Sequence, residues 1–272
     1  MAFEHELEVA LQAAEVASRI IRTEYETFVP IPNAPASITT HVDHAAQAAI
    51  LDLLHAAFPD DALCAEEKSE KLEVIPSEGE RVWIVDPIDG TRGFAQKNGE
   101  FSVMIALVVQ GEIAVGVVAE PMQDRVTFAR RGEGCHVRTG EVTTPCHVTG
   151  VTALGEATLV QSRSKKDRGP SGPVRYLQPK RVTETYSAGV KLARVARGEA
   201  ELYVIGYGSF HDWDLCAGHI LVTEAGGSVT DIRGNPLEYG LDGHLQNRGL
   251  VATNGVLHTD ALRRMSEATI VE

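Results

Sequence analysis

The sequence contains no apolar segment long enough to span a membrane. Its longest apolar run, Val103 to Val109, falls far short of the roughly 18 residues that cross a bilayer, and it predicts a buried strand instead. The first residues show neither a basic start nor a long apolar stretch, so we expect no secretory signal. Both absences argue against a membrane partner and favour a cytoplasmic location.

Cysteine and positive charge are also scarce. The 4 cysteines lie far apart and form no Cys-x-x-Cys pair, so a zinc site or a disulfide framework is poorly supported. Lys and Arg number 25 against 38 Asp and Glu, which gives a formal net charge of −13. Such an acidic chain, without a basic aromatic patch, is not expected to bind nucleic acid.

The spacing of apolar residues predicts a change of structure along the chain. Two amphipathic helices are expected at 3–28 and 43–58, and a strand hairpin at 101–109 and 112–119. The segment 165–173, rich in charge, Gly and Pro, is expected to be a mobile loop. The second half is expected to alternate helices and strands, at 190–197, 201–205, 214–225, 228–231 and 250–253.

This order of elements predicts an α+β or α/β chain with two layered subdomains. With 272 residues, of which 43% are hydrophobic, the chain is long enough for two closely packed cores. Residues 1–145 are expected to form an N-terminal α+β subdomain, and residues 146–272 a C-terminal α/β subdomain.

The segment 83–91 holds the clearest chemical pattern. A predicted buried strand ends at Asp86 and a turn brings Asp89 shortly after, so two carboxylates leave the same strand end. Gly90 permits close approach of the backbone, and Thr91 can begin a short helix. Carboxylates followed by N–H groups at a helix start suit a metal ion and the phosphate that it binds. The alternative is an ordinary polar turn at Asp89-Gly90.

Two further acidic positions follow the same pattern. Glu66 and Glu67 end an apolar run, although alone they would be read as a solvated surface pair, and Asp214 precedes a helical run, where it would be read as an N-cap. Clustered without a cation, such carboxylates would raise one another's pKa values. A set of oxygen ligands suited to Mg²⁺ would comprise Glu66, Asp86, the Ile88 carbonyl, Asp89 and Asp214.

Two longer segments carry a family resemblance. Residues 83–91 and 213–218, the latter continuing to 223–227, resemble the two signatures of the inositol monophosphatase superfamily. They occur in the expected order and at about the expected distance, with the Glu66-Glu67 pair upstream. The resemblance implies a layered αβαβα sandwich of the sugar phosphatase type, with an antiparallel sheet in the N-terminal half and a mixed sheet in the C-terminal half. It also implies a homodimer.

Three shorter segments, 98–103, 162–164 and 187–191, resemble the 3′(2′),5′-bisphosphate nucleotidases more than the inositol monophosphatases. In that subfamily the 3′-phosphate of adenosine 3′,5′-bisphosphate is removed to give AMP. Lys165 departs from the subfamily, which usually has His after Ser-Arg-Ser. The alternatives are an inositol or other sugar monophosphatase with the same metal site, and a binding or regulatory protein, which would not need an intact set of acids.

The resemblance further implies roles for individual residues. Thr91, oriented by Asp43, would help Glu66 and a metal deprotonate a water that attacks phosphorus in line, with no covalent intermediate and with sensitivity to lithium. Asp43 alone would be read as a helix cap, and Lys191 would grip a second phosphate. The ligands of two or more Mg²⁺ ions would be Glu66, Asp86, the Ile88 carbonyl, Asp89 and Asp214. Contacts with the phosphorylated metabolite would come from Asp89, Gly90, Thr91, Ser187, Lys191 and Asp214.

Overall fold

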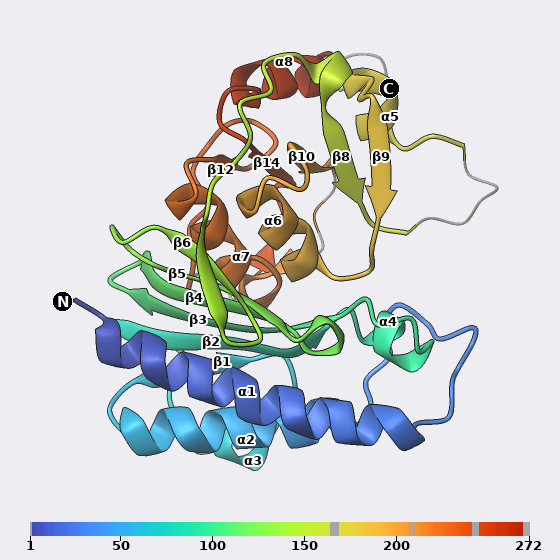
Figure 1. The fold of residues 1–272 in the computed structure, drawn as a ribbon. Coiled ribbons are helices and arrows are strands. Elements are labelled where there is room, and N and C mark those ends of the chain that lie inside the picture. Colours follow the sequence, from blue (N-terminus) through green and yellow to red (C-terminus); the bar gives the residue numbers. More distant parts are fainter. Residues whose placement is uncertain (1, 164–168, 207, 209, 241–244, 269–272) are drawn as a thin grey trace.

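Five layers of helices and sheets are visible in Figure 1. The structure is a computed structural model, and the residues that it describes are 2–163, 169–206, 208, 210–240 and 245–268. One outer layer of helices covers the first sheet, two helices lie between the sheets, and a second outer layer covers the other sheet. This arrangement confirms the predicted αβαβα sandwich.

The helices occur in three groups. The outer pair on the first sheet is α1 (Glu4–Thr27) and α2 (His41–Ala57). The central pair is α6 (Ala188–Ala196) and α7 (Asp212–Glu224), and the far layer holds α5 (Gly172–Leu177) and α8 (His258–Ala268). The short helices between strands are α3 (Glu70–Val74), α4 (Thr91–Ala95), η1 (Pro121–Gln123) and η2 (Leu154–Glu156).

The first sheet has seven strands that lie in chain order. The first two strands are parallel and every later neighbouring pair is antiparallel, which includes the predicted hairpin. The strands are β1 (Ala62–Ala65), β2 (Arg81–Asp89), β3 (Ser102–Val109), β4 (Glu112–Glu120), β5 (Arg125–Arg130), β6 (Cys135–Thr139) and β7 (Val142–Cys146).

The second sheet is mixed, as predicted. Its order is β12-β14-β10-β8-β9, with β8 parallel to both of its neighbours and β14 antiparallel to both of its own. The strands are β8 (Thr158–Gln161), β9 (Arg181–Glu184), β10 (Leu202–Ile205), β12 (Ser228–Thr230) and β14 (Leu250–Thr253). A separate small ribbon pairs β11 (Phe210–His211) with β13 (Leu245–Gln246).

Two sequence predictions need correction at helix starts. The second helix begins at His41, with Thr40 as its N-cap, and α7 begins at Asp212, with His211 as its N-cap. Asp214 is therefore the third residue of its helix, so the capping alternative for this residue had it at the wrong helix position. The predicted loop 165–173 lies partly outside the described residues, and its last part already belongs to α5.

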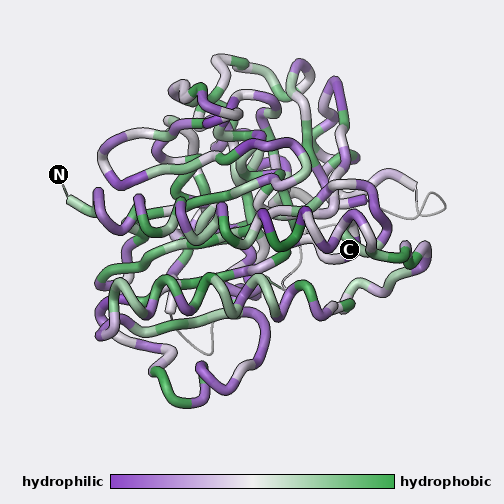
Figure 2. Tube along the Cα trace, turned by 60° about the horizontal axis from the view of Figure 1, so that its bottom comes forward, coloured by the Kyte–Doolittle hydropathy of each residue, from purple (hydrophilic) through white to green (hydrophobic). Residues whose placement is uncertain are grey.

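The apolar pattern of α1 explains how it covers the first sheet. Hydrophobic and hydrophilic residues alternate along the helical turns that follow the N-terminus in Figure 2, and the buried positions include Ala10, Ala13, Ala17 and Ile21. These side chains pack with the apolar face of β2 to β4 in one hydrophobic cluster. No helix among the described residues is both long and apolar enough to cross a membrane.

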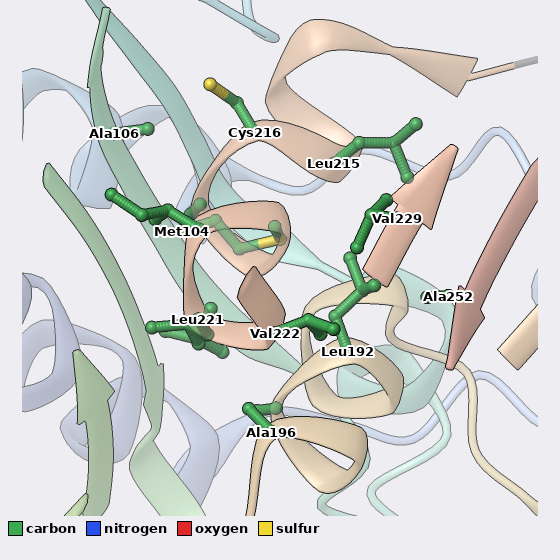
Figure 3. Close-up of a cluster of buried hydrophobic side chains, with 14 of the residues drawn as sticks. Met104, Ala106, Leu192, Ala196, Leu215, Cys216, Leu221, Val222, Val229 and Ala252 are labelled. Carbon is green, nitrogen blue, oxygen red and sulfur yellow. The ribbon is translucent and has the colours of Figure 1, made fainter. Parts of the chain in front are cut away.

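A second hydrophobic cluster joins the two halves of the chain. Met104 and Ala106 of β3 pack with Leu221 of α7, Leu192 of α6 and Val229 of β12 (Figure 3). Burial of this apolar surface from both halves fixes α6 and α7 against the first sheet. The division at residue 145 remains a proposal, and the first sheet ends beside it at β7.

The packing of β4 on α7 generates a prediction about Gly116. A Cβ atom at Gly116 would lie 2.3 Å from Cγ2 of Ile220 and 2.6 Å from the carbonyl oxygen of Ala217. We expect Gly116→Ala to lower the free energy of unfolding by about 1–3 kcal/mol, because an overpacked core must shift to accept the methyl group. Urea unfolding would measure this change.

The matched control is Gly150→Ala, since a Cβ atom at Gly150 would have no neighbouring atom within 4 Å. Its free energy of unfolding should stay within about 0.5 kcal/mol of the unsubstituted protein. Equal stability of the two variants would contradict the tight contact between β4 and α7.

Candidate metal and phosphate site

Parallel pairing of β1 and β2 brings two carboxylates to one sheet edge. Ala65 lies opposite Val85, and the backbone N–H of Glu66 donates to the carbonyl of Val85 at 3.1 Å. Glu66 and Asp86 therefore follow on neighbouring strands, and their carboxyl groups are close enough to shift each other's pKa. This is the convergence that the spacing along the chain could not establish.

Three aspartates form the centre of the cluster. Asp86, Asp89 and Asp214 each offer a carboxylate oxygen, and these oxygens lie within 4.8 Å of one another. The β2–β3 register shifts between Asp86 and Asp89, which places the second carboxylate at the same strand end. Asp214 arrives from the first turn of α7, more than 120 residues later in the chain. Four of the five expected ligand residues are thus together at this edge.

Asp43 and Asp214 occupy the same position in their helices. Each is the third helical residue, and each accepts the backbone N–H of the N-cap residue, from Thr40 at 2.9 Å and from His211 at 2.6 Å. Capping and a role in the site are therefore compatible for both residues. Sequence reasoning missed Thr40, although Thr-x-x-Asp before an apolar run signals a capping box.

Asp89 is held by the N-terminus of α6. Its Oδ1 accepts the backbone N–H of Ala188 at 3.1 Å, and its Oδ2 accepts that of Gly189 at 2.6 Å and the hydroxyl of Ser187. Ser102 contributes a longer contact at 3.4 Å and lies 2.9 Å from the Ser187 hydroxyl. Neutralising Asp89 would consequently disturb the junction between β2 and α6 as well as the site.

Burial and mutual repulsion hold protons on this cluster. Burial, then the charges of Glu66 and Asp89, raise the pKa of Asp86 well above its usual value. Burial also raises the pKa of Asp214 to about 7. Desolvation beside Asp86 raises the pKa of Glu66 to about 8, although its side chain keeps contact with solvent. A cation bound among these oxygens would favour the ionised carboxylates instead.

Thr91 links the cluster to Asp43. Its hydroxyl lies 3.0 Å from Oδ1 of Asp43 and 2.9 Å from the carbonyl oxygen of Ile88. A hydroxyl has one proton, so it donates to only one of these acceptors fully at a time. If the Ile88 carbonyl binds a cation, the Thr91 proton goes to Asp43 and the Thr91 oxygen is free to accept.

Gly90 brings the backbone close to neighbouring chain segments. It has φ 89° and is the N-cap of α4, whose first residue is Thr91. A Cβ atom there would lie 2.9 Å from the carbonyl oxygen of Glu100 and 3.1 Å from the amide nitrogen of Ser187. Only glycine suits this conformation and this spacing.

Lys191 is buried near the carboxylates of Asp89 and Asp214 rather than exposed at the surface. Its side chain is 1% exposed, its Nζ donates to the carbonyl of Tyr186 at 2.9 Å, and it lies 5.2 Å from the ring centroid of Tyr203. Burial lowers the pKa of Lys191 to about 8, against the opposing effect of the charges on Asp89 and Asp214. In this position its charge acts on the aspartates rather than directly on solvent.

Comparison with known proteins identifies the family. The model of the inositol monophosphatase family matches residues 3–269. The chain belongs to this family.

Two of its relatives carry the name of the nucleotidases that segments 98–103, 162–164 and 187–191 resemble. The chain is 34% identical over 242 residues to the 3′(2′),5′-bisphosphate nucleotidase CysQ of Escherichia coli (strain K12), which covers 86% of this chain and 93% of that protein. A probable 3′(2′),5′-bisphosphate nucleotidase 4 of Arabidopsis thaliana is 36% identical over 205 residues, and the match spans 69% of this chain and 59% of the plant protein. The IMPase structure of Thermotoga maritima aligns with a TM-score of 0.81 at 26% identity over 98% of both chains.

Family membership confirms the predicted fold and makes the protein a phosphatase of a metal-dependent family. It agrees with a chemistry that the geometry already favours, since three buried or half-buried aspartates this close together must either keep protons or bind a cation.

The raised pKa of Asp214 predicts how metal-free protein responds to pH. The unfolded chain loses this proton near the ordinary value of 3.8, whereas the folded protein keeps it up to about pH 7. The folded state therefore binds more protons in this window, so the contribution of Asp214 to stability falls as the pH rises. In EDTA, the free energy of unfolding should fall more between pH 4 and 7 for the natural protein than for Asp214→Asn.

At pH 7, Mg²⁺ should raise the free energy of unfolding more for the natural protein than for Asp214→Asn. The cation binds the ionised carboxylates, which are unfavourable in the folded protein without metal. Urea unfolding at a series of pH values, with EDTA and with Mg²⁺, makes the comparison. Parallel pH profiles for the two proteins in EDTA would show that Asp214 does not retain its proton.

Proposed function

We propose that this protein is a Mg²⁺-dependent phosphomonoesterase that removes the 3′-phosphate of adenosine 3′,5′-bisphosphate and releases AMP. The convergence of Asp86, Asp89 and Asp214 is the observation that supports the chemistry. The names of the Escherichia coli and Arabidopsis relatives support the substrate.

The donor set fits Mg²⁺. It consists of oxygen atoms from carboxylates and from one backbone carbonyl, which hard divalent cations prefer. Two or more ions are expected, with Asp86, Asp89 and Asp214 at the centre, Glu66 at the exposed edge and the Ile88 carbonyl completing the set. When bound, Mg²⁺ would lower the pKa of a water molecule and offset the charge of the phosphoryl oxygens.

The residues around this set would handle the proton of the attacking water. Asp43 accepts the Thr91 hydroxyl proton, which directs a lone pair of the Thr91 oxygen outward to accept from water. Glu66 lies at the exposed edge of the cluster, where a cation bound beside it would keep its carboxylate ionised and able to accept a proton. Attack in line with the leaving oxygen then needs no covalent intermediate.

The phosphate would bind next to the same elements. The backbone N–H groups of Gly90 and Thr91 are at the start of α4, and Ser187 lies against Gly90. Asp89 and Asp214 would contact substrate through the metal, and Lys191 would contribute its charge from below. This assigns residues 1–145 most of the metal ligands, and residues 146–272 Asp214 and part of the substrate contacts.

An inositol or other sugar monophosphatase is the alternative, favoured by the Thermotoga maritima structure. The family resemblance also favours a homodimer, and the cytoplasm is the location that we propose. Sedimentation equilibrium would test the dimer.

The substrate proposal predicts a ranking of activities. Phosphate release from adenosine 3′,5′-bisphosphate should exceed release from inositol 1-phosphate by at least roughly tenfold in kcat/KM, a difference of about 1.4 kcal/mol in transition-state binding. EDTA should abolish both activities, and Li⁺ should inhibit them. The opposite ranking would contradict adenosine 3′,5′-bisphosphate as the substrate, while the proposed metal site would still stand.

Glu66 is the best residue for testing the chemistry without disturbing the fold. It is exposed, whereas Asp89 holds α6 and Asp214 accepts the backbone N–H of the N-cap residue of α7. We expect Glu66→Gln to lower kcat by roughly 10²–10⁴-fold, the usual contribution of a positioned acid or base, while urea unfolding shows that the variant is folded under the assay conditions. Glu70→Gln, an exposed neighbour in α3, should retain full activity. A fully active Glu66→Gln protein would remove Glu66 from the mechanism.

A further inference from the structure

Segments that are far apart in the sequence meet beside the carboxylate cluster. Ser102 and Ser187 join two of them through their hydroxyls at 2.9 Å. A third segment joins through Glu100, whose carboxylate accepts two hydrogen bonds from the guanidinium of Arg163, with Nε 2.7 Å from Oε2. The segments brought together are 98–103, 162–163 and 187–191. These are the segments whose sequences resemble the bisphosphate nucleotidases.

The Glu100–Arg163 pair borders the proposed phosphate site. The carbonyl of Glu100 and the amide of Ser187 are the atoms that a Cβ at Gly90 would meet first. The carboxylate of Glu100 is also close enough to influence Lys191. A substrate whose 3′-phosphate lies at Gly90 would therefore have this ion pair at its side.

Arg163 is accessible to a ligand. Its side chain is 41% exposed, and among the described residues a second carboxylate, that of Glu184, lies 3.9 Å away. Its guanidinium lies 5.9 Å from the ring centroid of Tyr186, which limits the positions that the side chain can take. Arg92 contacts the same ring, but its Nε is used by the carbonyl of Ala34.

We propose that Arg163 binds the phosphate that is not hydrolysed, exchanging Glu100 for this phosphate when substrate binds. The planar guanidinium that makes two bonds to a carboxylate can make two bonds to a phosphate in the same geometry. In the free protein, Glu100 holds Arg163 beside the site and balances its charge. This inference rests on the proposed function and identifies the residue that would distinguish a bisphosphate from a monophosphate.

The test uses nucleotides that differ only in the second phosphate. Adenosine 3′,5′-bisphosphate carries both phosphates, adenosine 3′-monophosphate carries only the one that is removed, and AMP as an inhibitor carries only the other. In Arg163→Gln, KM for the bisphosphate and the inhibition constant of AMP should each rise by roughly tenfold or more, as for loss of a charged hydrogen-bonded pair. The kcat/KM for adenosine 3′-monophosphate should stay within roughly twofold, and Arg163→Lys should recover part of the loss.

The control is Arg175→Gln, which removes the same charge from an exposed position in α5 and should change none of these constants. Urea midpoints confirm that each variant is folded. A bisphosphate KM and an AMP inhibition constant that do not change in Arg163→Gln would overturn the inference while leaving the proposed function in place. A natural protein that hydrolyses neither nucleotide would overturn the proposed function, and the inference with it.

Glu100→Gln tests the exchange itself. Releasing Arg163 from its partner should tighten inhibition by AMP several-fold, because the ion pair no longer has to be broken. In the Arg163→Gln background the same substitution should give no such gain. An equal gain in both backgrounds would show that Glu100 merely repels the phosphate, which would overturn the exchange.

Discussion

Repulsion among buried carboxylates is the constraint on which this structure depends. Oxygens of Asp86, Asp89 and Asp214 lie within 4.8 Å of one another, and little solvent is present to screen their charges. Without a cation the cluster relieves the repulsion by retaining protons, as the raised pKa values of Asp86 and Asp214 show. The scaffold must therefore hold these groups at a separation that they would not adopt freely.

Helix N-termini provide much of that support. Asp43, Asp89 and Asp214 each accept backbone N–H groups at the start of a helix, where the helix dipole also favours a negative charge. The apolar cluster between the sheets fixes α6 and α7, so Asp89 and Asp214 stay beside Asp86. The bonds that stabilise the fold are the ones that orient the carboxylates, and folding and site formation are coupled.

The local charge resolves the contrast between an acidic protein and an anionic substrate. The formal net charge is −13, yet the charge of Lys191 acts on Asp89 and Asp214, Arg163 pairs with Glu100, and cations are expected within the cluster. Each of these positive groups is already partnered, with Lys191 bonded to a backbone carbonyl and Arg163 to Glu100. An anion meets positive charges whose positions are set before it arrives, and of these two only the half-exposed Arg163 is open to direct contact.

Apolar periodicity and the order of elements determined the layered α/β architecture, and the acids at strand ends, together with the family resemblance, indicated the ligand set from sequence. Only the tertiary structure decided that β1 lies parallel to β2, that Asp89 is bonded to α6, and that Lys191 is buried below the site. Asp214 shows the difference well, since the sequence predicts its place near a helix start, and only the structure shows that His211 is the N-cap and Asp214 the third helical residue. Local spacing indicates which residues belong to the same helix or strand. Hydrogen bonds such as that from Gly189 to Asp89 join residues far apart in the chain and form only when the layers pack.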